Sequence, residues 1–425
     1  MRGSARRRAV PVTALALSLA LVAACSGDGG GEASADDPLQ FFLSGDANQG
    51  GGYAHMAAKY EEETGVTVEI VDIANEDLGT RLRNAAQADD LPALARPGGI
   101  DPVWLDATVD LSEIVDGSDI RTDMATIQPD GKVVSIPSDV TAVGMFVNKS
   151  LFDEAGVELP TSEEDIWTWD EFTDSVRQVQ EATGTSYGMV MDRSIHRLKA
   201  FMYQFGSDWW QPQEDGEWTT NEASRVALEY LYELNDDEFM PRSVWLSDGD
   251  PNALFKSGDV VSYLSGSWQI ADFAANIADF EWASVYLPAQ EVRATNYGNA
   301  ANIVVFEGTG QEEAAVDFLA WLYEPDNYRE LAQVSGFLPA IEGLDVEYDE
   351  HAEAFDLYNE EIAASAQVAS DVLRTEFVYR AAGEDTDDTP MREEVIRYLN
   401  DEQDVDATIQ AISDERTERL GALPE

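Results

Sequence analysis

Residues 136–172 read IPSDVTAVGMFVNKSLFDEAGVELPTSEEDIWTWDEF, and this stretch decides the fold class. Its segment 141–147, TAVGMFV, is apolar, β-branched or aromatic throughout, which predicts a buried strand. A short helix is expected over residues 151–155, ending at Gly156, because glycine readily adopts the left-handed backbone of a helix end. Thr168 is the predicted N-cap of another helix, because Glu171 follows three residues later, as in a capping box.

Strands and helices alternate on both sides of this stretch. Residues 39–43, LQFFL, and 66–71, VTVEIV, predict two strands separated by a glycine-rich loop and a helix over 53–64. This is a βαβ unit, in which ligands lie beyond the carboxyl ends of the strands. The loop lacks the Gly-Lys-Ser/Thr of a phosphate loop, so we interpret it as a turn. The fold class is therefore α/β, and near the end an amphipathic helical stretch is expected over residues 395–420.

The N-terminus has the pattern of an export signal. Basic residues precede an apolar run, and residues 1–24 are too short and too differently flanked for a spanning helix. The exit, LVAAC, resembles a bacterial lipobox, which makes Cys25 the expected lipid attachment site. Residues 25–37 are a polar, glycine-rich tether. The alternative is a plain signal peptide with an incidental cysteine, and with one Cys no disulfide framework exists.

The composition is strongly acidic. The formal net charge is −57, yet 44% of the residues are hydrophobic and ten are Trp, which indicates a folded chain rather than a disordered one. Only five residues are Lys, as is typical of a halophilic protein, although a merely acidic secreted protein also fits. Nucleic acid is disfavoured as a partner, and we expect none, because no basic patch is available to bind phosphates. The length of 425 residues favours two domains.

Further motifs carry a resemblance to a known family. Residues 255–268, FKSGDVVSYLSGSW, residues 296–305, NYGNAANIVV, and residues 336–340, GFLPA, follow the opening stretch in order. Together they resemble the maltose-type (family 1) extracellular solute-binding proteins of bacterial carbohydrate ABC importers. The resemblance covers nearly all of residues 38–420, but Ala93 stands where the family usually has Asp.

The resemblance implies a two-lobed, periplasmic-binding-protein-like fold with three interlobe crossings and a ligand cleft. Residues 38–142 and 289–336 would form the N-lobe, and residues 143–288 and 337–425 the C-lobe. Residues 285–288 would carry the chain back toward the N-lobe, and residues 296–305 would form a strand. The implied function is an extracellular lipoprotein that binds a sugar, a di- or oligosaccharide, and delivers it to membrane permease subunits. We expect a monomer that touches the membrane through its lipid only.

The residues support binding better than catalysis. The three His are scattered, and neither HExxH nor GxSxG occurs, so we expect no enzyme activity, metal or cofactor. Asp250 is interpreted as a helix cap rather than part of a calcium loop. A sugar needs flat aromatic platforms and a few oriented polar groups. The candidates are Asp46, Asn48, Arg96, Asp139, Trp209, Trp210, Trp245, Trp268, Tyr297, Asn299, Phe337 and Arg374.

Each candidate also has a simpler interpretation. A Trp is more often a core residue than a site residue, and an Arg such as Arg374 is often part of a surface salt bridge. Only the Gly-Ser-Trp match favours Trp268 as a site residue over a core one. Two other functions stay open: a secreted carbohydrate-active enzyme, and a binder of another solute such as a polyamine, a peptide or glycerol phosphate.

Overall fold

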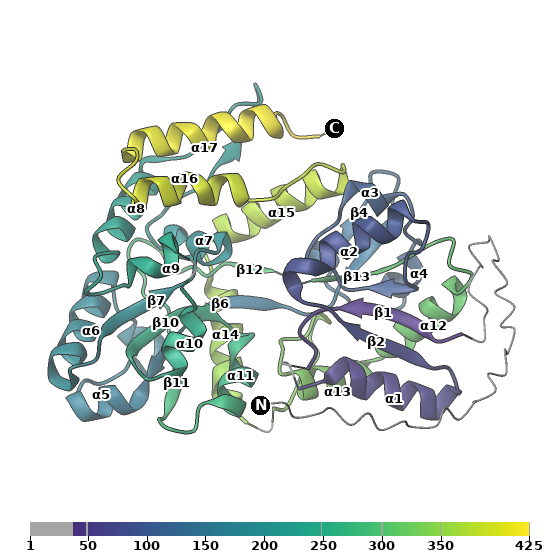
Figure 1. Ribbon diagram of the computed structural model, residues 1–425, viewed down its shortest axis with the longest axis horizontal. Helices are drawn as coiled ribbons and strands as arrows, with labels where there is room; N and C mark the ends of the chain where they lie inside the picture. Colours follow the sequence, from purple (N-terminus) through teal and green to yellow (C-terminus); the bar gives the residue numbers. More distant parts are fainter. Residues whose placement is uncertain (1–36, 48–49, 248, 299–300, 349, 425) are drawn as a thin grey trace, which may run out of the picture. The chain divides into compact units, whose positions relative to one another are not determined.

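The computed structural model describes residues 37–47, 50–247, 249–298, 301–348 and 350–424. Two mixed sheets organise this part of the chain (Figure 1). The first sheet has the order β2-β1-β3-β13-β5-β4, with strands Val68–Asp72, Leu39–Leu43, Leu94–Ala95, Asn302–Val305, Val133–Pro137 and Thr126–Ile127. The second has the order β11-β6-β10-β7, with strands Trp282–Val285, Thr141–Asn148, Val260–Gly266 and Tyr187–Met191, and β12 (Tyr297–Gly298) also pairs with β6.

The first lobe consists of the first sheet and the helices packed on it. Its core is aromatic on one face, where Phe41 meets Tyr53 and Phe318 edge to face. The opposite face buries Trp104 against Phe306. The helices of this lobe are α1 (Gly52–Thr64), α2 (Asn75–Gln87), α3 (Pro102–Leu105), α4 (Ser112–Asp116), η1 (Thr122–Met124), α12 (Glu312–Leu322) and α13 (Pro325–Ser335).

The second lobe consists of the second sheet and the remaining helices. Every residue of β6 is buried, as its apolar, β-branched sequence predicts for a central strand. The helices of this lobe are α5 (Lys149–Ala155), η2 (Glu163–Asp165), α6 (Trp169–Thr183), α7 (Ile195–Gln204), α8 (Glu222–Leu234), α9 (Arg242–Leu246), α10 (Pro251–Lys256), α11 (Gln269–Asn276), α14 (Ala352–Ala364), α15 (Gln367–Ala381), α16 (Thr389–Leu399) and α17 (Val405–Arg419). Its strands β8 (Gln211–Pro212) and β9 (Trp218–Thr219) form a separate hairpin.

Local signals in the sequence set several helix ends. Thr168 and Glu171 form the predicted capping box at the start of α6. Gly156 ends α5 in the left-handed conformation, and the Asp250 side chain accepts from the Ala253 N–H at the start of α10. These three predictions are confirmed. They could be made from the sequence because each depends only on interactions within one turn.

The structure divides two predicted elements. The stretch expected over 395–420 is helical, but it consists of two helices, α16 and α17, because Asp401 takes a positive φ of 61° and Asp404 caps a new helix at the Ala407 N–H. The single strand expected within 296–305 is two strands, since β12 pairs with β6 in the second sheet and β13 lies between β3 and β5 in the first.

The chain passes between the two sheets three times. The first passage follows Pro137 and the second follows Gly298. The third comes after Ile341, which still bridges to Ile120 of the first lobe, and before α14, which packs on β6 and β11. Residues 294–298 lie with the second lobe, where Ala294 is in the core, so the observed second passage comes later than the boundary placed at residue 289.

The first two passages and the segment that leads to the third are tied together by hydrogen bonds. Ser138 donates from both its N–H and its Oγ to the Ala301 carbonyl, at 3.1 and 2.9 Å. The Val140 N–H donates to the Leu338 carbonyl at 2.8 Å. We call this set, residues 138–140 with 301 and 338, the hinge, because rotation of one lobe against the other must bend the backbone here.

Candidate functional site

Three strands of the first lobe end at one edge of the sheet. β1 runs parallel to β3, and β13 runs antiparallel to both β3 and β5, so β1, β3 and β5 share a direction. Three candidate residues follow these strands: Asp46 after β1, Arg96 after β3 and Asp139 after β5. The fold therefore brings them together at the carboxyl edge, where sheets of this kind place their ligands.

Arg96 and Asp139 bind each other. Arg96 Nη2 donates to Asp139 Oδ1 at 2.8 Å, and Arg96 Nε donates to Ser138 Oγ at 2.9 Å. Burial alone would lower the pKa of the Arg96 guanidinium, but the Asp139 carboxylate, together with Tyr53 and Tyr328, raises it. Both side chains are about 95% buried, at 5% and 3% exposure. The pair therefore fixes the first passage of the hinge to the end of β3.

Two tyrosines, one directly after α12 and one in α13, support the same passage. The Tyr323 hydroxyl donates to the Pro137 carbonyl and the Tyr328 hydroxyl donates to the Ser138 carbonyl, each at 2.6 Å. Burial raises the pKa of both phenols well above the usual value, so they remain protonated donors. The first-lobe end of the hinge is thus a rigid, fully buried polar cluster.

Asp46 caps the helix that follows it. Its carboxylate accepts from the Tyr53 N–H at 2.8 Å and the Ala54 N–H at 3.1 Å, in the first turn of α1. Burial raises the pKa of this carboxyl, and the two N–H donors oppose that rise. Asp46 is only 4% exposed. Its main structural role is therefore to hold the first loop against α1, which sets where that loop lies at the sheet edge.

The second lobe presents an indole at the matching edge of its own sheet. β7 and β10 are parallel, and Trp268 follows β10. Gly266 lies directly under the indole: a Cβ at this position would come within 2.1 Å of the ring. Trp268 is partly buried, and only glycine leaves room for the ring to lie on the end of the strand.

Two residues at the start of α7 border this indole. The Arg197 guanidinium carbon lies 4.4 Å from the centroid of the Trp268 ring, and Arg197 Nη2 is held by Asp192 Oδ2 at 2.7 Å. The His196 ring lies 5.8 Å from the indole, and the Asn296 amide contacts its Nδ1. Burial, followed by the charges of Arg197 and Lys199, lowers the pKa of His196 to about 3. His196 is therefore neutral at neutral pH.

The hinge places the two edges close together. The Ser267 N–H donates to the Ala142 carbonyl at 2.9 Å, and the Ala142 N–H donates to Ser267 Oγ at 3.3 Å. Ala142 is three residues beyond Asp139, a span of at most about 11 Å. The indole plate and the first-lobe polar cluster therefore border one region beside the hinge, which we call the candidate site.

Four candidates lie in apolar cores instead. Trp209, Trp210 and Trp245 are at most 1% exposed in the core of the second lobe, and Phe337 is 5% exposed in the core that includes the first lobe. Trp209 and Trp210 pack edge to face at 5.3 Å. The loop positions of Trp209 and Trp210 suggested accessible rings. Both rings are buried instead, because the free energy gained by burying an indole exceeds the entropy cost of ordering a short loop.

Tyr297 and Arg374 line a cavity of about 490 Å³ between α15 and η1–β4. Arg374 is 70% exposed and pairs with Asp371 at 3.1 Å, the surface interaction considered for it. Three predicted residues, Asn48, Asn299 and Cys25, lie outside the described residues, as do the proposed signal and all of the tether except Asp37.

The sequence interpretation missed His196 and Arg197 as site residues. The signal for them was available, because they follow the predicted strand 187–191 just as Trp268 follows β10. In the described part of the chain, no group of three or more His, Cys, Asp or Glu is placed to hold a metal ion. Within the same residues, no helix has the length and apolarity needed to cross a membrane.

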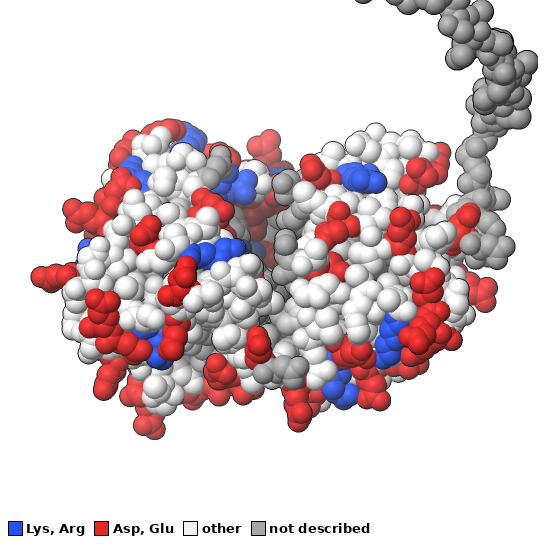
Figure 2. Space-filling model, turned by 60° about the horizontal axis from the view of Figure 1, so that its bottom comes forward, with Lys and Arg blue, Asp and Glu red and all other residues white. Residues whose placement is uncertain are grey.

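The arrangement suits a polar ring compound. An indole offers a flat surface to C–H groups, while a guanidinium and amides offer hydrogen bonds to hydroxyls. Figure 2 shows acidic side chains spread over the whole visible face, with few basic ones between them. The acidity is therefore diffuse and does not by itself select a cationic ligand.

Comparisons with known proteins show the family of the chain. A family model described as bacterial extracellular solute-binding protein matches residues 55–355. Over 226 residues the chain is 30% identical to an arabinooligosaccharide-binding protein of Halalkalibacterium halodurans, covering 49% of this chain and 48% of that protein. The chain thus spans about half the length of the curated relatives it matches.

Solved structures show the same fold. The cyclic α-maltosyl-1,6-maltose binding protein of Arthrobacter globiformis aligns with a TM-score of 0.66 at 23% identity, covering 90% of this chain and 99% of that one. UgpB of Mycobacterium tuberculosis, in complex with glycerophosphocholine, aligns with a TM-score of 0.70 at 14% identity, covering 90% and 98%. The two-lobed α/β architecture is therefore shown.

Proposed function

Because the chain belongs to the bacterial extracellular solute-binding protein family, we propose that it binds a di- or oligosaccharide outside the cell and delivers it to the permease subunits of an ABC importer. The sugar assignment rests on one observation. The Trp268 indole lies on Gly266 at the sheet edge, and the Arg197 guanidinium lies beside the indole. The arabinooligosaccharide specificity of the 30% identical relative supports it.

In the proposed complex a sugar ring stacks on Trp268 and its hydroxyls bind polar groups from both lobes. Arg197 borders the indole and is 14% exposed, so it can donate to a hydroxyl without losing Asp192. Asn48 and Asn299 are proposed partners because the first loop and the second passage lead to the same region. Arg96 and Asp139 act by positioning these loops, since each already satisfies the other.

Ligand binding closes the two lobes by rotation at the hinge. Closure needs contacts that are better in the closed form, and a ring held between Trp268 and the first-lobe loops supplies them. The permease then recognises the closed form. We propose that the sugar is released unchanged, so that the protein has no enzyme activity, in keeping with a family of binding proteins.

The protein is proposed to act at the outer face of the cell membrane as a monomer. The family is extracellular, and the lipobox-like segment ending at Cys25 supports a lipid anchor after cleavage. Mass spectrometry of the mature N-terminus tests this directly. A lipid-modified cysteine is expected there, and Cys25→Ser is expected to release the protein into the medium.

A thermal-shift screen tests the function. Mono-, di- and oligosaccharides are compared with a polyamine, a peptide mixture and glycerol phosphate, because a ligand that binds only the folded state raises the melting temperature. At 100 times its Kd a sugar adds about 2.7 kcal/mol of stability. A shift with a saccharide and with no other class is expected. Protection by glycerol phosphate alone would assign the site to that solute class instead.

Product analysis separates binding from turnover. The purified protein is incubated with the sugar that shifts its melting temperature, and the sugar is recovered and examined by chromatography. Complete recovery of intact sugar is expected. Hydrolysis products at a rate proportional to protein concentration would identify a carbohydrate-active enzyme.

A further inference from the structure

The second lobe contains a cavity that none of the candidate-site residues lines. Its volume is about 570 Å³, and it lies between helices α6 and α8, the end of α7 and the loop that follows β11. All of its lining residues belong to the second lobe, so rotation of one lobe against the other leaves it intact. A cavity of this size can hold a small organic molecule.

The floor of this cavity is apolar. Ala223, Val226 and Tyr230 line it from one face of α8, because they are spaced by three and four residues. Phe205 also lines it and is 3% exposed, with its ring centroid 5.1 Å from that of Tyr230. Among the described residues only six large hydrophobic side chains are exposed, and Val226, at 48%, is one of them. The floor therefore leaves apolar surface that a ligand can cover.

Both charged residues that line the cavity are acidic. Asp170 lies in the first turn of α6, and Glu291 lies in the loop after β11. The Tyr230 hydroxyl donates to Asp170 Oδ1 at 3.1 Å, and among the described residues neither carboxylate has another side-chain partner. The cavity therefore combines an apolar floor with two carboxylates that no basic side chain balances.

Neighbouring groups do not neutralise these carboxylates. Arg225 of α8 pairs with two other carboxylates, and so does Arg293, which lies two residues after Glu291. Burial and the charge of Asp170 raise the pKa of Tyr230 to about 12. The phenol therefore stays protonated at neutral pH and donates one hydrogen bond, which leaves the second oxygen of the Asp170 carboxylate for another donor.

Hydrogen bonds hold the walls of the cavity in place. Gln204, fully buried at the end of α7, accepts from Trp169 Nε1 at 2.7 Å and donates to the Ala294 carbonyl at 3.0 Å. Its own carbonyl accepts from the Glu291 N–H at 2.8 Å. The start of α6, the end of α7 and the loop after β11 are thus joined through one residue.

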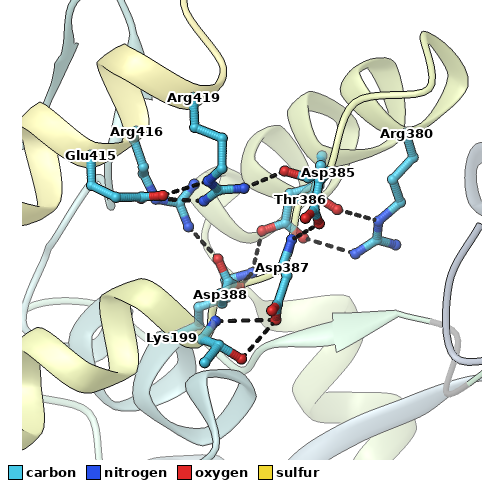
Figure 3. Close-up of polar contacts among 11 residues, drawn as sticks. Lys199, Arg380, Asp385, Thr386, Asp387, Asp388, Glu415, Arg416 and Arg419 are labelled. Carbon is cyan, nitrogen blue, oxygen red and sulfur yellow. Dashed lines mark hydrogen bonds and ion pairs between the residues drawn. The ribbon is translucent and has the colours of Figure 1, made fainter. Parts of the chain in front are cut away.

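A network of buried ion pairs fixes α7 on another side. Lys199 of α7 is 6% exposed and contacts Glu376 of α15, and it also lies 3.3 Å from Asp388 at the start of α16. Arg416 of α17 pairs with the same Asp388 (Figure 3). Burial raises the pKa of Asp388, but Lys199 and Arg416 outweigh it and lower the pKa. Because α7 cannot shift without breaking charged pairs, the cavity is preformed, which reduces the cost of binding a ligand.

The lining favours one class of ligand. A cation is attracted by the two carboxylates and by the face of a tyrosine ring, and an apolar body is attracted by the floor. An anion would be repelled by both carboxylates, and a saccharide would place hydroxyls without partners against the apolar floor. The net charge of −57 also raises the concentration of cations near the surface.

We propose that this cavity is a second binding site, for a small organic cation with an aromatic or aliphatic body, such as an arylalkylammonium ion. Its charged group binds Asp170 and Glu291, and its body covers Val226 and Phe205. The proposal goes beyond the proposed function and does not depend on which sugar the candidate site takes.

Calorimetric titration tests the ligand class. The probe is phenethylammonium, added to the full chain carrying Cys25→Ser at about 0.15 M salt, where distant surface charges are screened. One site with a Kd on the order of 1 mM is expected for so small a ligand. Phenethyl alcohol and hydrocinnamate, which carry the same ring without the positive charge, should bind at least about tenfold more weakly. Equal binding of the alcohol, or no binding of the amine, would overturn the proposal.

A substitution inside the cavity tests the location. Val226→Arg places a guanidinium beside the two carboxylates and is expected to weaken phenethylammonium binding by about tenfold or more. Val103→Arg is the matched control, because Val103 is a 50% exposed valine on α3 of the first lobe. Thermal melting checks that both variants are folded. Wild-type affinity in Val226→Arg would place the amine elsewhere and would also overturn the proposal.

Removal of the charges tests the recognition itself. Asp170→Asn/Glu291→Gln keeps the shape of the cavity and should weaken phenethylammonium binding by about tenfold, with little change for phenethyl alcohol. Asp153→Asn/Glu154→Gln, at two exposed acids of α5, removes the same number of charges outside the cavity and should leave the affinity unchanged. If both double variants weaken binding equally, the amine is held only by the diffuse acidity of the surface, and no second site exists.

Discussion

The Arg96 guanidinium and the Asp139 carboxylate meet at 2.8 Å, joining the end of strand β3 to the first passage between the lobes. Both residues were predicted to bind ligand, and both lie where ligands are expected. Their mutual pairing makes them a support for the site. Arg and Asp side chains can hydrogen-bond to sugar hydroxyls, but they can also pair with each other. At this buried sheet edge Arg96 and Asp139 hold each other and are not left free for a ligand.

Removal of one member of this pair should destabilise the fold strongly. Asp139→Ala leaves a buried guanidinium without its partner, and we expect the free energy of unfolding to fall by about 3–5 kcal/mol in urea titration. Asp371→Ala, which breaks the exposed pair with Arg374, is the control and should cost less than about 1 kcal/mol. The double variant Arg96→Met/Asp139→Leu should recover much of the loss. If both single variants lower the free energy of unfolding equally and only slightly, the buried pair does not stabilise the fold.

Replacement of the indole plate should weaken sugar binding. Trp268→Ala removes the stacking surface, and we expect a loss of roughly 2 kcal/mol, which is about 30-fold in Kd by calorimetry. Trp321→Ala is the control, because this partly buried indole packs on Tyr60 in the first lobe, away from the candidate site. An unchanged Kd for Trp268→Ala would remove this residue from the site.

Loss of the buried lysine should release the C-terminal helices. Lys199→Met leaves Glu376 and Asp388 without their shared cation, so the free energy of unfolding should fall by about 3–5 kcal/mol. Lys149→Met serves as the control, since Lys149 is 39% exposed and its pairs with Asp153 and Glu281 lie at the surface. A change below about 1 kcal/mol is expected for it. If both variants behave alike, the network does not hold α15.

His196 should make stability depend on pH. Its pKa is about 3 in the folded protein, against about 6.5 in an unfolded chain, so between these values the unfolded state binds a proton that the folded state does not. The free energy of unfolding is therefore not lowered by His196 above about pH 6.5. As the pH falls from there toward 3, it decreases by up to about 1.4 kcal/mol per pH unit. His196→Gln should flatten this slope in urea titrations at several pH values. His351→Gln, at the ring stacked on Trp282, should keep it.

Much of the fold was predictable because its signals are local. The strand at Thr141, the Thr168–Glu171 capping box and the Asp250 cap depend on neighbours within one turn or one strand. The division of the stretch around Gly298 depends on partners far away in the sequence. For Gly298 those partners are β6 and, through Leu373, a helix more than seventy residues later, with Leu373 Cδ1 3.3 Å from the position of an added Cβ.

The site was harder to predict than the fold for a similar reason. Trp209, Trp210 and Trp268 all follow element ends, and the sequence shows nothing that distinguishes an indole turned inward from one at the surface. Only the glycine two residues before Trp268 indicated a ring laid on a strand end. The pairing of Arg96 with Asp139 joins residues 43 positions apart and needed the sheet order to be known.

Strand β13 has a consequence for how the protein is made. It occupies the middle of the first sheet, between β3 and β5, although it is encoded some two hundred residues after β3. While the ribosome is still synthesising the second lobe, β3 and β5 lack their shared neighbour and expose unpaired backbone. The first sheet therefore cannot close until residue 305 has emerged from the ribosome, so the earliest half of the chain depends on its later half to fold.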